Sequence, residues 1–177
     1  MRHNRVRDAL TAAFDRAGWV TRHETTIDTR DEMQDRINNG TLPAGTEPKA
    51  TIADAQLAAP GRQIVVDVRV VGRSPIQKSA NNDEGTKRIK YSEVMAAHPN
   101  LTFQPYVITV YGTYGKETEA FMNSSTKTWT AASKKTLNTD LSLILAHYNG
   151  VMSMMSLSKG ARKDQFPSFN KHFRRTA

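Results

Sequence analysis

The sequence predicts an α/β (α+β) domain, in which a mixed central sheet of about four strands is flanked by helices. Three observations support this class: a helical apolar pattern opens the chain, four strand-like segments follow up to residue 111, and helical patterns dominate the rest. The expected order is helix, three strands, helix, strand and two helices. With 177 residues, the chain is long enough to bury a real core.

The N-terminal part is expected to contain a helix and a strand. Residues 4–17 carry apolar side chains at helical spacing, and Gly18 follows as a stop signal. Residues 19–27 are predicted to form the first strand. Residues 28–49 are polar and contain chain breakers, so we expect a loop there, with a short helix around residues 33–37.

Residues 51–57 and 63–71 are predicted to form a hairpin, because residues 59–62 make a turn-like link between them. Alternate side chains of a strand point to opposite faces, and both faces of residues 63–71 are mostly apolar. This pattern predicts a central strand that is covered on both sides. Residues 72–85 are polar and rich in turn formers, so they are expected to form a mobile loop.

The C-terminal half is predicted to be mainly helical. A helical stripe at residues 87–98 ends before Pro99, and residues 102–111 form a further strand with a glycine-containing exit turn. Two helices are expected at 117–135 and 139–157, the second with an apolar face that belongs to the core. We assign residues 1–158 to one domain and residues 159–177 to a basic tail that contains aromatic side chains.

Charge and composition narrow the class of partner. The chain has 25 Lys and Arg against 17 Asp and Glu, a net charge of +8, which favours an anionic partner such as nucleic acid. It has no cysteine, which excludes disulfides and thiolate zinc sites and favours a reducing compartment. The N terminus is too polar for a signal peptide, and no apolar run approaches the roughly 18 residues of a membrane helix. We therefore expect a soluble intracellular protein, nuclear or cytoplasmic, without membrane contact.

The most informative feature is a pair of aspartates in neighbouring strands. Asp54 and Asp67 each interrupt an apolar strand-like segment. A carboxylate in such a place loses hydration, and a bound divalent cation is a common compensation. Lys87 follows at the start of a predicted helix. Two carboxylates for a metal and a lysine for a phosphate or a water make a nuclease-like set.

Asp54, Asp67 and the run Lys87-x-x-Lys90-Tyr91 together resemble the catalytic signature of a known family. It is the restriction-like endonuclease domain of site-specific non-LTR retrotransposons, a branch of the PD-(D/E)XK superfamily, in which the lysine has moved from the strand into the following helix. The resemblance covers about residues 1–120.

Further residues bear on this resemblance. The opening Arg2-His3 and the later Phe103-x-Pro105 are similar to the family pattern. Two positions depart from it, because Ala53 stands where the family has proline and Arg69 stands where the superfamily has its strand lysine.

The resemblance implies a restriction-endonuclease-like core with extra C-terminal helices, and an endodeoxyribonuclease that uses Mg²⁺ or Mn²⁺. Asp54 and Asp67 would ligate the metal, with the carbonyl of Val68 as a further oxygen ligand and Glu24 as a candidate third carboxylate. Lys87 would orient the attacking water or neutralise the pentavalent intermediate. The residues that would contact nucleic acid are Arg2, His3, Arg69, Arg88, Lys90 and Tyr91; Tyr91 would otherwise pack against the sheet.

The same resemblance implies DNA as the partner, either duplex or branched. A homodimer is one arrangement for cutting both strands, and a larger polyprotein of a mobile element is one context for the chain.

Each site residue also has a plainer interpretation. Asp67 can be a buried carboxylate that pairs with Arg69 or Arg88, because an ion pair also offsets desolvation. Asp54 and Glu24 can be surface carboxylates. The two lysines of the helix can form a solvated face, as charged helix residues usually do.

Two other functions therefore stay open. One is a catalytically inactive nucleic-acid-binding module on the same fold, in which Ala53 and Arg69 mark lost activity. The other is a basic structural or capsid-associated protein, in which both aspartates are incidental.

Overall fold

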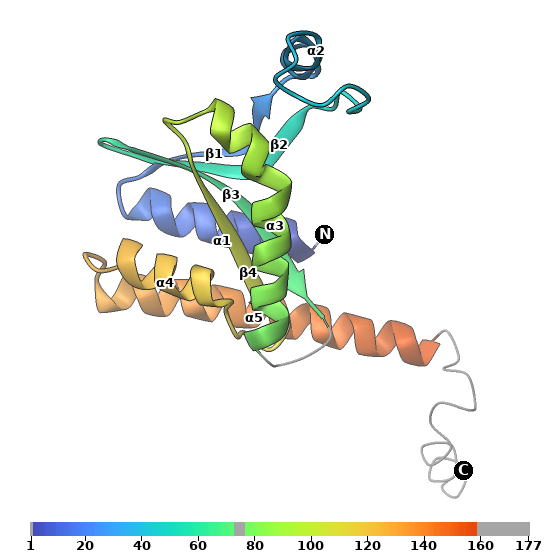
Figure 1. Ribbon diagram of the computed structural model, residues 1–177. Helices are drawn as coiled ribbons and strands as arrows, with labels where there is room; N and C mark the ends of the chain where they lie inside the picture. The colour runs from blue at the N-terminus through green and yellow to red at the C-terminus, as the bar shows by residue number, and fades with distance from the viewer. Residues whose placement is uncertain (1, 73–76, 159–177) are drawn as a thin grey trace, which may run out of the picture.

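The computed structural model of the chain describes residues 2–72 and 77–158. Its centre is a four-stranded mixed sheet with strand order β1-β2-β3-β4 (Figure 1). β2 runs antiparallel to both β1 and β3, and β4 runs parallel to β3. The α+β class and the four-stranded mixed sheet are therefore confirmed. The strands are β1 Val20–Asp28, β2 Thr51–Ala59, β3 Arg62–Val71 and β4 Thr102–Thr109.

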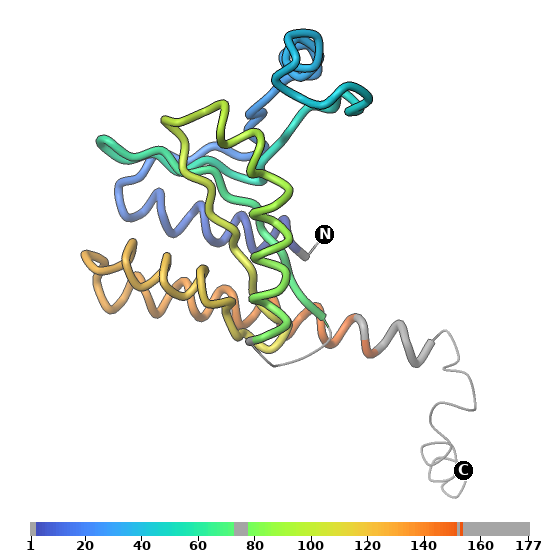
Figure 2. The backbone as a smooth tube through the Cα atoms, in the orientation of Figure 1, coloured from blue at the N-terminus to red at the C-terminus, as the bar shows by residue number. Residues whose placement is uncertain are grey.

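Helices cover both faces of this sheet. α1, α4 and α5 pack in one apolar cluster with one face, and α3 packs on the other face (Figures 1 and 2). Helix α2 projects from the body between β1 and β2 (Figure 1). The helices are α1 Arg2–Arg16, α2 Arg30–Asn38, α3 Gln77–Ala97, α4 Lys116–Ser125 and α5 Ala131–Ser158.

β3 is the central strand that the sequence predicts. Its residues Ile64, Val66 and Val68 belong to the cluster formed with α1 and α5. Val65 lies in the opposite cluster, together with Tyr91 of α3. Full burial of such a side chain contributes roughly 1.5–3 kcal/mol, so this strand anchors both layers.

The polar segment before Lys87 is not a loop. Residues 77–85 form the first turns of α3, whereas residues 73–76 lie outside the described part of the chain. Ala80 is fully buried against Val71 and Val107. Glu84, also buried, accepts hydrogen bonds from the first turn of α4. These tertiary contacts outweigh the weak helix propensity of the local sequence.

The break between the last two helices also differs from the prediction. It falls at residues 126–130 rather than between residues 135 and 139. Thr130 caps α5, because its Oγ1 accepts a hydrogen bond from the Ser133 amide at 3.1 Å. Trp129 is buried, with its ring centroid 5.0 Å from that of Phe14 in α1. The interruption thus places an aromatic side chain in the core.

The remaining expectations concern the short helix, a membrane-spanning segment and the C-terminal tail. The short helix expected around residues 33–37 is α2, which begins earlier because Thr29 and Glu32 form a capping box. Within residues 2–72 and 77–158, no helix has the length and apolar character needed to cross a membrane. The tail assigned to residues 159–177 lies outside the described residues.

Candidate functional site

The candidate site lies where two strands of the sheet separate. β2 and β3 pair from Ala59 opposite Arg62 only as far as Ala55 opposite Val66. β2 nevertheless stays paired with β1 down to Thr51. An open cavity of about 480 Å³ lies at this separation. Described residues from α1, β2, β3 and α3 line it: His3, Ile52, Asp54, Asp67, Val68, Arg69, Val70, Lys87 and Lys90.

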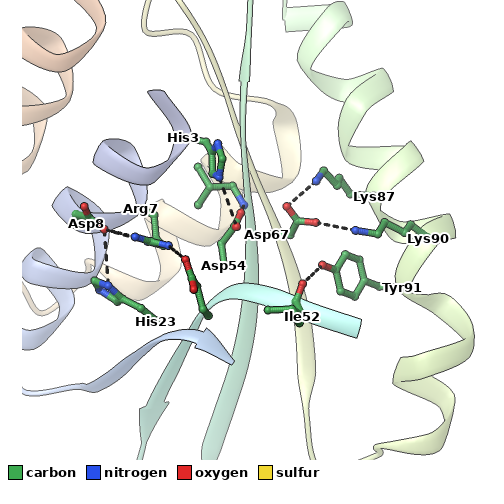
Figure 3. A network of polar contacts seen from close by, with 12 residues as sticks. His3, Arg7, Asp8, His23, Ile52, Asp54, Asp67, Lys87, Lys90 and Tyr91 are labelled. Atoms are coloured by element: carbon green, nitrogen blue, oxygen red, sulfur yellow. Dashed lines mark hydrogen bonds and ion pairs between the residues drawn. The ribbon is translucent and has the colours of Figure 1, made fainter. Parts of the chain in front are cut away.

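The separation leaves two backbone groups that side chains satisfy. The amide of Val68 donates a hydrogen bond to Oδ2 of Asp54 at 2.6 Å. The carbonyl oxygen of Ile52 accepts one from the Tyr91 hydroxyl at 3.0 Å (Figure 3). Because an unpaired buried backbone group is costly, both contacts hold the strands in this open arrangement. The hydrogen bond from Val68 also fixes the Asp54 carboxylate at the edge of the cavity.

Asp67 is the most enclosed charged group of the site. It lies on the face of β3 that α3 covers, and its side chain is only 7% exposed. Its Oδ1 is 2.5 Å from Nζ of Lys87, and its Oδ2 is 3.7 Å from Nζ of Lys90 (Figure 3). The two ammonium groups offset the desolvation of the carboxylate. Both predicted lysines are therefore directed at the buried aspartate.

The two arginines do not share this contact. Nε of Arg69 lies 3.4 Å from Oδ1 of Asp83, and the Arg69 side chain is half exposed. Nε of Arg88 donates to Oε2 of Glu117 at 2.5 Å. The interpretation in which Asp67 pairs with Arg69 or Arg88 is therefore wrong, since lysines take that place.

Tyr91 belongs to the core beneath the site. Its side chain is fully buried and stacks on Phe103 with ring centroids 4.3 Å apart. Burial and then the charge of Asp67 raise the pKa of Tyr91 well above its ordinary value, so the hydroxyl stays protonated. Of the two roles expected for this residue, packing against the sheet is the one observed. Full burial also removes it from any surface that a nucleic acid could touch.

Asp54 has a different electrostatic environment. Burial raises the pKa of its carboxyl above the ordinary value; the hydrogen bond from Val68 opposes this shift, and the charge of Asp67 adds to it. Nε2 of His3 is 3.9 Å from Oδ1 of Asp54 (Figure 3). Arg2 begins α1, and its side chain lies outside the described part of the structure. The predicted His3 is thus part of the cavity.

Glu24 is the predicted carboxylate that the structure does not bring into the cavity. It occupies the position between His23 and Thr25 in the ladder with β2, beside Asp54. Its backbone has a φ of 47°, which is uncommon for a residue with a side chain. Its carboxylate accepts a hydrogen bond from Nη1 of Arg7 at 3.1 Å and is 71% exposed.

The cavity has a donor set that suits a hard divalent cation. Asp54 and Asp67 supply carboxylate oxygens from neighbouring strands, and Val68 also lines the cavity. Mg²⁺ is commonly held by one or two carboxylates together with phosphate oxygens and waters. Among the described residues, no group of three or more His, Asp or Glu side chains is placed to hold a metal. Among side chains, a cation here would therefore rely on these two carboxylates, and its other oxygen ligands would come from a backbone carbonyl, from water or from a bound phosphate.

Glu84 is a residue of this region that falls in residues 72–85, the segment that the sequence predicts as a loop. It is 1% exposed and lies on the same face of α3 as Lys87 and Tyr91. The signal that could have revealed it is the helical spacing of Ala80, Glu84, Lys87 and Tyr91, which continues the predicted helix stripe backwards.

Comparison with known proteins gives no family assignment: no protein-family model matches the chain, and no curated protein sequence matches it either.

Proposed function

We propose that this chain is a metal-dependent DNA endonuclease of the restriction-like type, which hydrolyses phosphodiester bonds in duplex or branched DNA. One observation carries the proposal. Asp54 and Asp67 line the same cavity from two neighbouring strands, and Nζ of Lys87 lies 2.5 Å from the Asp67 carboxylate. The mixed four-stranded sheet between helices supports the restriction-endonuclease-like core that the sequence suggests.

The proposal gives each residue of the cavity a role. The carboxylates of Asp54 and Asp67, with the Val68 carbonyl, would hold Mg²⁺ or Mn²⁺. When bound, such an ion supplies Lewis-acid stabilisation of charge on the phosphate and lowers the pKa of water. Lys87 would direct its ammonium group at a phosphate oxygen, because lysine carries a compact charge on a flexible stem. His3 and Lys90 would contact the DNA phosphates on either side of the phosphodiester that is cut.

The electrostatics of the chain favour DNA as the partner in this proposal. The net charge of +8 attracts a polyanion, and the exposed Arg69 and Lys90 border the cavity. The cavity is open rather than enclosed, which suits a backbone phosphate of a large substrate. Homodimerisation would let two such sites cut both strands of a duplex.

A second candidate is a nucleic-acid-binding module without catalysis. It is favoured by the contacts of Asp67, which already has two lysine counterions from the chain itself. It is also favoured by Arg69, which stands at the strand-lysine position but pairs with Asp83. In this reading the carboxylate and lysine pairs only stabilise the fold.

A nicking assay separates the two candidates. Wild type, Asp67→Asn and Asp35→Asn are incubated with supercoiled plasmid and with a four-way junction, in Mg²⁺, Mn²⁺ or EDTA. Asp35 is an exposed residue of α2 and serves as the matched control. The proposal expects metal-dependent cutting by wild type and the control, and no detectable cutting by Asp67→Asn. Binding without cutting in either metal would select the second candidate, and cutting by Asp67→Asn would refute the site.

A further inference from the structure

Asp67 is a proposed cation ligand whose two oxygens both face an ammonium group of the same chain. Lys87 reaches Oδ1 at 2.5 Å and Lys90 reaches Oδ2 at 3.7 Å. Asp54, by contrast, has one oxygen bound to a backbone amide and the other facing His3 at 3.9 Å. The two carboxylates of the site are thus unequal, because only Asp67 is neutralised by lysines.

A cation on Asp67 would share that carboxylate with both lysines. Like charges a few ångströms apart repel one another, and the repulsion is stronger where burial lowers the effective dielectric constant. The side chains of Asp67 and Lys87 are only 7% and 17% exposed. A divalent cation therefore binds weakly as long as both ammonium groups stay on the carboxylate.

A phosphodiester changes this balance. Its oxygens are alternative acceptors for an ammonium group, and lysine can turn toward them on its flexible stem. Lys90 is free to do so because its side chain is 59% exposed. The same phosphate offers oxygens that a hard cation prefers. Binding of the phosphate thus removes the competing charges and completes the cation site in one step.

We infer that Lys87 and Lys90 are exchangeable counterions of Asp67, which makes a divalent cation and a nucleic-acid phosphodiester bind this site cooperatively. The inference rests on the proposed function and adds a regulation of the same site. Coupling between two ligands is reciprocal, so the cation must strengthen nucleic-acid binding by the same factor. The chain then avoids holding a reactive cation when no substrate is bound.

Calorimetric titration of the full chain with Ca²⁺ tests the coupling without relying on activity. Ca²⁺ serves as the probe because it also takes oxygen ligands. The titration is run with and without a short DNA duplex, and the duplex is checked afterwards for integrity. The variants are Lys87→Met/Lys90→Met and, as a control of equal charge, Lys134→Met/Lys135→Met, two exposed lysines of α5.

The expected results are specific to the two lysines of the site. The duplex raises the Ca²⁺ affinity of wild type about tenfold, within the usual range of coupling between sites. Lys87→Met/Lys90→Met binds Ca²⁺ about tenfold more tightly than wild type without duplex, and the duplex then raises its Ca²⁺ affinity by a smaller factor than it does for wild type. The control double variant behaves as wild type. Lys90→Met alone, at an exposed position, shows the same direction of change if the double variant folds poorly.

Two results would overturn the inference: a Ca²⁺ affinity of wild type that is the same with and without duplex, or site variants that bind Ca²⁺ no better than wild type. Failure of the proposed function looks different. Coupled binding without plasmid cutting would keep the inference and reject the endonuclease. Cutting without coupling would keep the endonuclease and reject the inference.

Discussion

Glu84 of α3 accepts two hydrogen bonds from Thr118 of α4, one from the backbone amide at 2.8 Å and one from the hydroxyl at 2.7 Å. A third comes from the amide of Glu117 at 3.0 Å. A carboxylate at a helix N terminus is stabilised by the unpaired amides and the helix dipole. A Cβ at Gly115 would lie 2.2 Å from Oε1 of Glu84, so glycine is required there. This contact joins α3 to α4 one turn before Lys87.

We predict that Glu84→Gln destabilises the fold. The glutamine loses the charge and turns an amide donor toward backbone donors, so the free energy of unfolding falls by about 2 kcal/mol. Urea unfolding measures the change. Glu93→Gln, at an exposed position of the same helix, should stay within about 0.5 kcal/mol of wild type. Equal stability of Glu84→Gln and wild type would mean that the contact contributes little.

Asp54→Asn should stabilise the chain at neutral pH. Burial raises the pKa of Asp54 in the folded state above the ordinary value of 3.8, with the Val68 amide opposing and the charge of Asp67 adding to the shift. The favourable contribution of the protonated group is therefore present below pH 3.8 and is lost as the pH rises through the raised pKa. Asparagine imitates the protonated form and keeps an oxygen for the Val68 amide.

The measurement is urea unfolding of wild type and Asp54→Asn across the acid range. The stability gain of the variant should be largest at neutral pH and should shrink as the pH falls through the titration of Asp54. Asp35→Asn, an exposed residue of α2, is the control and should show no such gain. A gain that is independent of pH would contradict the electrostatic explanation.

Asp28 links α2 to the end of α3, and Asp28→Ala is expected to loosen that link. The buried carboxylate contacts Nη1 of Arg36 and lies 2.6 Å from Nε2 of His98. Loss of these charged hydrogen bonds should cost about 2 kcal/mol. Hydrogen exchange of the α2 backbone amides should accelerate in Asp28→Ala. Asp35→Ala, a substitution on α2 itself, should leave the exchange of the backbone amides around Asp28 unchanged. Unaltered exchange in Asp28→Ala would refute the link.

Nucleic-acid binding should weaken steeply with salt. A chain that neutralises phosphates releases counterions, so the logarithm of the association constant falls linearly with the logarithm of salt concentration. Lys90→Met should reduce the slope by about one, whereas Lys134→Met should leave it unchanged. Fluorescence anisotropy of a labelled duplex measures both slopes. A flat salt response would count against both functional candidates.

Much of the fold could be predicted because local patterns specify it. Residues 63–71 alternate between two apolar faces, and the turn at residues 59–62 dictates an antiparallel partner. These two facts suffice to place Asp54 and Asp67 in neighbouring strands. The structure confirms the hairpin and finds both carboxylates at one cavity.

Other parts were decided by contacts between distant residues. The segment Asn81-Asn82-Asp83 favours a turn by itself, yet it is helical because Glu84 binds α4 and Ala80 packs on the sheet. The division between α4 and α5 follows Trp129, which enters the core beside α1. No local pattern reports such contacts, so both boundaries differ from the prediction.

The sequence by itself determined which groups would carry the proposed chemistry: two strand carboxylates and a helix lysine at a spacing that a hairpin and a helix bring together. Only the tertiary structure decided which partners each of these groups contacts. The separation of β2 from β3 opens the cavity, Lys87 and Lys90 neutralise Asp67, and Glu24 turns to Arg7. The physical reason is that strand pairing and side-chain periodicity are local, whereas the partner of a buried charge depends on which elements pack around it.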